Sequence, residues 1–84
     1  DSQGRHLVST NVALEVDRQP GIDEIILKHT LIWDLCVRTL EGFSIEELRD
    51  SERLPVKESL LEAINGELRN GIVTAVYFTD FIMQ

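Results

Sequence analysis

The sequence has few cysteines, no long apolar stretch and no signal-peptide pattern, and each of these absences excludes a class of protein. Its 84 residues include a single cysteine, Cys36, so an internal disulfide is excluded and cysteine usage leaves the compartment open. No apolar stretch approaches the ~20 residues that a membrane-spanning helix needs. The first residues, Asp1–Arg5, do not have the layout of a signal peptide. We therefore expect a small domain that folds as a soluble unit.

Basic residues are also few, because eight Lys and Arg stand against fifteen Asp and Glu, for a formal net charge of −7. A nucleic-acid backbone or an anionic membrane surface is bound through clustered Lys and Arg, so neither is expected as a partner. A chain of this length forms one domain that buries roughly 60–65% of its unfolded surface. There is no room for a second domain.

The two ends of the chain have the residue pattern of β-strands. From His6 to Val16 apolar and polar residues alternate, which predicts a half-buried strand. The last twelve residues, Val73–Gln84, form a second β-type run in which both alternating sets are largely apolar. Such a strand is expected to be covered on both faces. Two strands alone make a marginal sheet, so a further strand is expected.

Helical patterns fill the middle of the chain. A helix entered through Pro20-Gly21 is expected to run to about Leu40, because its apolar residues follow the 3.6-residue period. A second stripe with i, i+4 spacing widens its apolar arc, so one part can lie on the sheet while the other meets a neighbouring helix or another protomer. This stripe consists of Leu27, Leu31 and Leu35.

Two further helices are expected before the last strand. Ser44 and Glu47 have the spacing of a capping box, which predicts a short helix to about Arg49. Pro55 fits the first turn of a third helix, which ends before Asn70-Gly71 and carries its apolar stripe at Val56, Leu60, Ile64 and Leu68. The predicted fold class is therefore α+β, in the order β-α-α-α-β, with three helices on one side of a small sheet.

No residue is assigned a catalytic, cofactor-binding or metal-ligating role. His29 is predicted on an apolar helix face, where a histidine with a structural role is the expected case. The acidic cluster has neither the spacing nor the glycine of a calcium loop, and is interpreted as a solvated helix face. It consists of Glu46, Glu47, Asp50 and Glu52. Cys36 is expected to be a buried small hydrophobe.

The strand-like C-terminus Val76–Gln84 follows three other stretches in a fixed order: Leu14–Asp17, Asp34 leading to Ser44–Leu48, and Leu60–Asn65. Together these stretches resemble the flagellar basal-body-associated protein family FliL, over about His6 to Gln84. Asn65 matches an asparagine that is frequent in that family. For Asn65 we expect a side-chain hydrogen bond to the backbone, with an interface contact as the alternative.

The resemblance to FliL implies a function without catalysis. It implies an inner-membrane protein with one transmembrane anchor, which is absent from this chain, and with this domain in the periplasm. It also implies a strand just upstream of His6 and a likeness to stomatin (SPFH) scaffold domains. The implied partners are other copies in a ring, the basal body and stator proteins of the MotA/MotB type. The alternative is a generic stomatin-like membrane scaffold or an adaptor unrelated to flagella, and an enzyme comes third.

Six residues are candidates for a protein interface. Trp33 and Thr30 depart from the resemblance, since a basic residue and a helix-bending proline are frequent there, and the helix is therefore expected to be straighter. Trp33 is either an interface anchor or part of the core. The exposed side of the last strand is the other candidate surface, and the alternative is that Tyr77 and Phe81 are core while the opposite set is partly exposed. The candidates are Leu27, Leu31, Leu35, Trp33, Tyr77 and Phe81.

Overall fold

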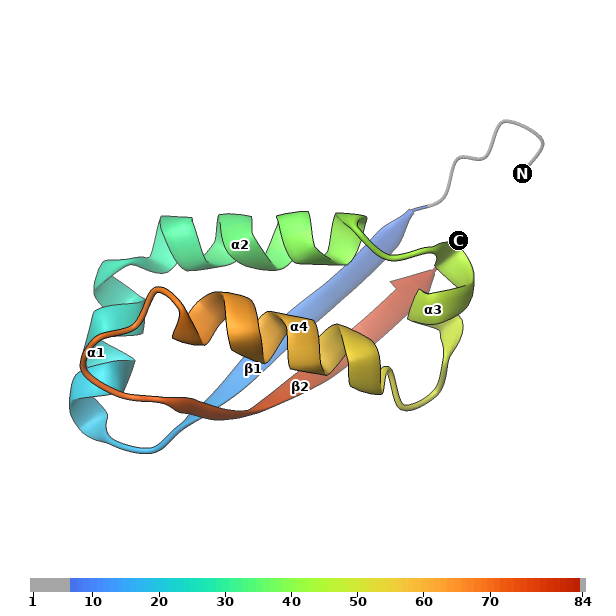
Figure 1. The fold of residues 1–84 in the computed structure, drawn as a ribbon. Coiled ribbons are helices and arrows are strands. Elements are labelled where there is room, and N and C mark those ends of the chain that lie inside the picture. Colours follow the sequence, from blue (N-terminus) through green and yellow to red (C-terminus); the bar gives the residue numbers. More distant parts are fainter. Residues whose placement is uncertain (1–6, 84) are drawn as a thin grey trace.

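The computed structural model describes residues 7–83, and its elements follow the order β1, α1, α2, α3, α4, β2 (Figure 1). The two strands form one sheet, and all the helices lie between them in the sequence. The predicted α+β class is confirmed. His6 and Gln84, which the sequence assigns to the outer ends of the strands, lie outside the described residues.

The sheet consists of β1 (Val8–Val16) and β2 (Val73–Met83), which pair antiparallel. β1 has the predicted half-buried pattern, since its residues are alternately half-buried and exposed from Thr10 to Val16. One end of the sheet is fixed by Asp17. Its N–H donates to the Ile72 carbonyl at 3.0 Å, and its Oδ1 accepts from the Ile72 N–H at 2.8 Å.

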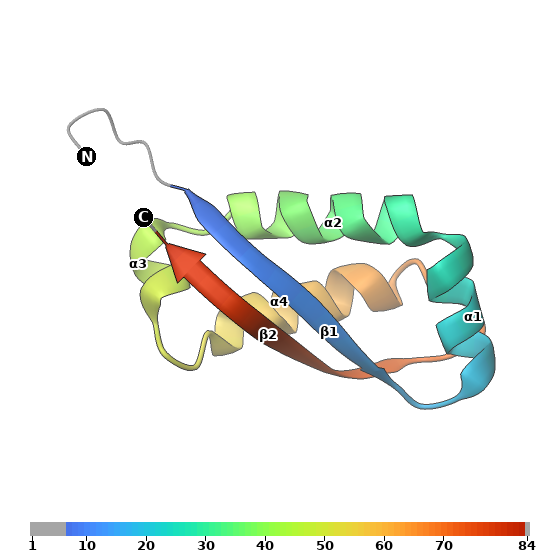
Figure 2. The same ribbon diagram turned by 180° about the vertical axis from the view of Figure 1, so that it is seen from behind.

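The prediction that β2 is covered on both faces is wrong. The helices cover one face of the sheet, and the other face is open (Figures 1 and 2). Strict alternation along β2 is lost as well, because the register shifts opposite Thr10 and near Val16, and Asp80 has a left-handed φ of 54°. These irregularities change which side chains face inward. The residues that pack toward the helices are Val73, Val76, Phe78, Phe81 and Met83.

The first predicted helix is divided into two helices. α1 (Gln19–Leu27) and α2 (His29–Glu41) are separated by Lys28, whose φ of −97° and ψ of 23° are not helical. The two helices meet at a sharp corner in both views (Figures 1 and 2). The expectation of a straighter helix is therefore wrong, although the corner contains neither proline nor glycine. Pro20 lies in the first turn of α1, as predicted.

The later helices begin where the sequence predicts. α3 (Ile45–Arg49) has the expected capping box: the Glu47 N–H donates to Ser44 Oγ at 3.1 Å, and the Ser44 N–H donates to Glu47 Oε1 at 2.8 Å. The bond from the Ser44 N–H to the Glu47 carboxylate, followed by the contribution of the Ser44 hydroxyl, lowers the pKa of Glu47. α4 (Leu54–Asn65) has Pro55 in its first turn.

The core lies between the helix layer and the covered face of the sheet. Three residues of the stripe predicted on α4 provide its centre, since Val56, Leu60 and Ile64 have no exposed surface. Burial of each such side chain contributes roughly 1.5–3 kcal/mol. The predicted end of this helix before Asn70-Gly71 is wrong, because α4 ends at Asn65 and Leu68 lies beyond it. Cys36 is buried as predicted, and burial raises the pKa of its thiol. The other buried apolar residues are Ile32, Leu48, Val73 and Val76.

Candidate interaction surfaces

The polar side chains that could take part in catalysis or bind a metal ion do not gather at one place in the part of the chain that the structure describes. Among residues 7–83, no group of three or more His, Cys, Asp or Glu side chains is placed to hold a metal ion. His29 is exposed, and it lies on the same side of α2 as Ile32 and Cys36, so the predicted apolar helix face is confirmed while a structural role for His29 stays a prediction. In the acidic cluster, Glu47 caps α3 and Asp50 accepts a hydrogen bond from the Arg53 N–H at 3.1 Å.

A hollow apolar surface runs between β1 and α2, and we call it the edge groove. It consists of two hollows that share Trp33 in the middle of α2. One hollow lies toward α1 and is lined by side chains such as Val12, Leu14 and Ile25. The other lies toward α3 and is lined by side chains such as Leu7, Val37 and Phe43. Both hollows are lined by residues of β1 and α2, and β1 is the strand on the α2 side of the sheet (Figure 2).

β1 has little of the usual protection of an edge strand, because Glu15, near its end, is its one charged residue. Natural edge strands carry charged residues, proline or bulged residues that discourage pairing with another strand. Residues 7–14 of this chain contain no charge and no proline, and the extra residue of the bulge lies on β2. The free edge of β1 is thus suited to accept another strand.

The helix layer is also wider than the sheet beneath it. α2 and α4 lie next to each other over the same face (Figure 1). Two packed helices span roughly 20 Å, because each helix is about 10 Å wide. Strands lie only about 4.8 Å apart, so two strands fill roughly half of that width. The uncovered part of the helix layer belongs to α2, above the edge groove.

A second apolar surface lies on the outer side of α1. Leu27 is 86% exposed and Ile26 is 67% exposed, and Ile22, one turn earlier, is 37% exposed. Only Gly21 and Glu24 of α1 are buried. We call Ile22, Ile26 and Leu27 the α1 ridge. Its exposure on a charged domain is typical of a contact surface rather than of a free helix face.

Of the six predicted interface residues, four are exposed and two are half-buried. Leu31 is 40% exposed, Trp33 is 48% exposed and Tyr77 is 49% exposed, and Leu27 belongs to the α1 ridge. Leu35 and Phe81 are half-buried and pack against the core. An interface role for the six residues stays a prediction.

Phe81 is in the core layer because of the bulge in β2. Its ring lies edge-on to Phe78, with ring centroids 5.5 Å apart. The Arg53 guanidinium lies over the Phe81 ring, 3.6 Å from its centroid. Arg53 Nε also donates to the Leu48 carbonyl at 2.6 Å. Phe81 therefore links β2 to the segment between α3 and α4.

The uncovered face of the sheet is small and mostly polar. Tyr77 lies opposite Ala13 there, and Asn11 lies opposite Thr79. Asn11 Nδ2 donates to Asp80 Oδ2 at 3.3 Å. An aromatic ring among small and polar side chains offers a limited apolar area, so we rank this face below the edge groove and the α1 ridge.

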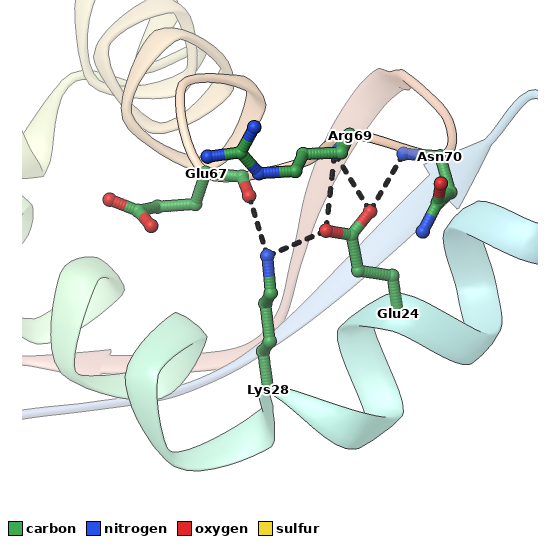
Figure 3. Close-up of polar contacts among 5 residues, drawn as sticks. All are labelled: Glu24, Lys28, Glu67, Arg69 and Asn70. Atoms are coloured by element: carbon green, nitrogen blue, oxygen red, sulfur yellow. Dashed lines mark hydrogen bonds and ion pairs between the residues drawn. The ribbon is translucent and has the colours of Figure 1, made fainter.

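The sequence did not reveal the polar cluster at the corner between α1 and α2 (Figure 3). Glu24 is 6% exposed, and its carboxylate accepts from Lys28 Nζ at 2.6 Å and from the N–H groups of Arg69 and Asn70 at 2.8 Å. The bond from Lys28, followed by those from Arg69 and Asn70, lowers the pKa of Glu24 to about 2. Lys28 Nζ also donates to the Glu67 carbonyl at 2.9 Å. No local pattern indicates this cluster, because Glu24 lies 45 residues before its partner Arg69.

The Asn65 side chain makes the backbone contacts that the sequence predicts. Its Oδ1 accepts from the Val73 N–H at 2.8 Å, and its Nδ2 donates to the Val73 carbonyl at 3.0 Å. The end of α4 is thereby fixed to the beginning of β2. The expectation of a fold-stabilising bond is confirmed.

The fold and its surfaces define an α+β domain whose prominent features are apolar contact surfaces. The flagellar basal body-associated protein FliL family model matches residues 1–84, and the chain belongs to this family. It is also similar to the flagellar protein FliL of Aquifex aeolicus (strain VF5), with 33% identity over 75 residues. That match covers 88% of this chain and 47% of the relative, so the chain spans about half the length of the curated relative.

The family is described as one of flagellar basal body-associated proteins. None of the helices within residues 7–83 is long and apolar enough to cross a membrane.

Proposed function

We propose that this chain is part of the periplasmic domain of a single-pass inner-membrane protein that supports the stator units of the flagellar motor without catalysis. Family membership supports the flagellar part of this proposal. The rest is supported by the apolar surface left exposed on so small a domain, with Leu27 86% exposed and Ile26 67% exposed. Such surfaces are suited to protein contacts.

Self-association into a ring is the second part of the proposal. Contacts between two different surfaces of identical subunits produce rings when the rotation closes. The α1 ridge and Leu31 of α2 provide one apolar surface, and the likeness to stomatin scaffolds implied by the sequence is compatible with the observed α+β fold. A net charge of −7 opposes association through most of the remaining surface.

Light scattering over a range of concentrations tests self-association, with Leu31→Glu as the variant and Thr30→Glu as the matched control. Both positions are exposed and adjacent on α2, so both variants add the same charge. We expect the mass of the unsubstituted chain and of T30E to rise with concentration, while L31E stays monomeric and folded. A monomer at every concentration, or unfolding of L31E, would contradict a contact at Leu31.

Binding to the purified periplasmic part of the stator tests the flagellar role. A complex that T30E retains supports the proposal. A chain that self-associates but ignores the stator would favour the generic stomatin-like scaffold or adaptor instead.

We also propose that the intact domain has a strand preceding β1 that lies in the edge groove. The weakly protected edge of β1 and the excess width of the helix layer both support it. In the full-length protein, amide hydrogens of residues 8–16 that point away from β2 should then exchange slowly. Fast exchange at these amides, with slow exchange in the rest of β1, would contradict an added strand.

A further inference from the structure

The corner between α1 and α2 has no cause in the local sequence. Residues 22–41 contain neither proline nor glycine, and their apolar residues follow one helical period. Sharp bends in helices normally occur at proline, at small residues or where a side chain interrupts the backbone bonds. A continuous helix is therefore what these residues favour on their own, and something outside the helix must hold the corner.

The helical hydrogen bonds are kept on either side of the corner. The Lys28 N–H donates to the Glu24 carbonyl at 2.9 Å, and the Ile32 N–H donates to the Lys28 carbonyl at 2.9 Å. Both are i to i−4 bonds, as in a continuous helix. Lys28 itself has non-helical backbone angles, so a change in the direction of α1 is centred on this residue.

The contacts that oppose straightening come from the segment that joins α4 to β2. Glu24 accepts from the N–H groups of Arg69 and Asn70, and Lys28 donates to the Glu67 carbonyl (Figure 3). The Glu24–Lys28 ion pair, at 2.6 Å, joins the two sets of bonds. One buried carboxylate therefore connects the corner to a segment 45 residues further along the chain.

Apolar packing holds α1 only weakly. Three of its apolar side chains form the exposed α1 ridge, and Ile25 is the one that packs against the core. Gly21 also lies against Gly71, where an added Cβ on Gly21 would come within 3.0 Å of the Gly71 Cα. The polar bonds of Glu24 and Lys28 are thus the main contacts that set the direction of α1.

We infer that Glu24 and Lys28 form a latch that holds residues 19–27 at an angle to α2, and that α1 turns about Lys28 when the latch is released. Release moves the α1 ridge relative to α2, within the reach of Asp17 and Arg18, which join Gln19 to the end of β1. Glu24 is a positioning residue here. This inference concerns the single chain and does not depend on self-association.

Distances between spin labels test the latch directly. Labels at Asp23→Cys in α1 and Glu58→Cys in α4, in a Cys36→Ala background, report the direction of α1. The variant is Glu24→Gln, whose amide cannot replace the charge that pairs with Lys28. The matched control is Asp34→Asn, because Asp34 also forms an i, i+4 pair, with Arg38 at 2.9 Å, but on an exposed surface.

For E24Q we expect a second population with a distance changed by on the order of 5 Å, since a nine-residue helix that turns about its Lys28 end is about 13 Å long. Amide exchange at Arg69 and Asn70 should become at least tenfold faster, while ellipticity at 222 nm stays constant or becomes stronger. Lys28→Met should shift the populations in the same direction. D34N should change neither the distance distribution nor the amide exchange at Arg69 and Asn70.

Two results would overturn the latch. One is an unchanged distance distribution in both E24Q and K28M. The other is a loss of ellipticity with fast exchange over residues 22–27, which would show that the bonds stabilise the helix itself rather than its direction. Because the readouts use monomeric protein, failure of the latch and failure of self-association are distinguishable.

Discussion

Asn65 allows a quantitative test of how the end of α4 is fixed to β2. Its amide bonds both the N–H and the carbonyl of Val73, a residue that is 2% exposed. Asn65→Ala leaves both backbone groups without these partners, in a place that water reaches poorly. A buried polar group without a partner costs about 1–3 kcal/mol, so we expect a loss of about 2–4 kcal/mol in the free energy of unfolding.

Urea unfolding followed by circular dichroism measures this loss, and thermal unfolding should show a fall in Tm on the order of 10–25 °C for a domain of this size. Glu62→Ala is the control, because Glu62 lies on the exposed side of the same helix. A cost below about 0.5 kcal/mol for N65A would refute the reasoning, since typical exposed substitutions cost that little.

Asn65→Asp refines the same test through pH. The carboxylate still accepts from the Val73 N–H, but its second oxygen faces the Val73 carbonyl, so the folded state favours the protonated form. The pKa of the introduced carboxyl should thus lie above its unfolded value of about 3.9. Its contribution to stability is present below that value and is lost as pH rises through the folded pKa. N65D should approach the wild type near pH 3 and fall below it at pH 7.

Three further predictions concern the core, the cap and the corner. Leu60→Ala should cost about 2–5 kcal/mol in urea unfolding because Leu60 has no exposed surface, while Leu61→Ala, at a half-buried neighbour, should cost less. Ser44→Ala should cost about 1 kcal/mol by removing the hydroxyl that accepts from the Glu47 N–H, and Ser44→Asp should restore most of it. The low pKa of Glu24, about 2, means that its stabilisation is complete above its ordinary value of 4.5 and is lost as pH falls toward 2. Acid unfolding of E24Q should therefore be less steep than that of D34N over this range.

The sequence predicted the elements whose causes are local. The capping box of Ser44 and Glu47, the proline at the start of α4 and the stripe of Val56, Leu60 and Ile64 depend on residues within a few positions of one another. Local rules hold for such features because neighbouring side chains determine both the hydrogen bonds and the buried face.

The misjudged features depend on residues distant in the sequence. The corner at Lys28 depends on bonds between Glu24 and the N–H groups of Arg69 and Asn70. The inward position of Phe81 depends on where β1 ends its regular pairing with β2, and on the left-handed φ of Asp80. A periodicity in one segment contains no information on such partners, so the helix was expected to be straight and β2 to alternate strictly.

The two edges of the sheet differ, and this difference bears on the two proposed contacts, the added strand and the contact between copies. β2 carries the bulge and Asp80 at φ 54°, which disfavour pairing with another strand. β1 lacks charge over residues 7–14 and lies beside an apolar groove. A second copy of this domain would bring its own helix layer, which is wider than two strands and would collide with α2 at that edge. The edge groove therefore suits a single strand, and contacts between copies are left to helix surfaces such as the α1 ridge.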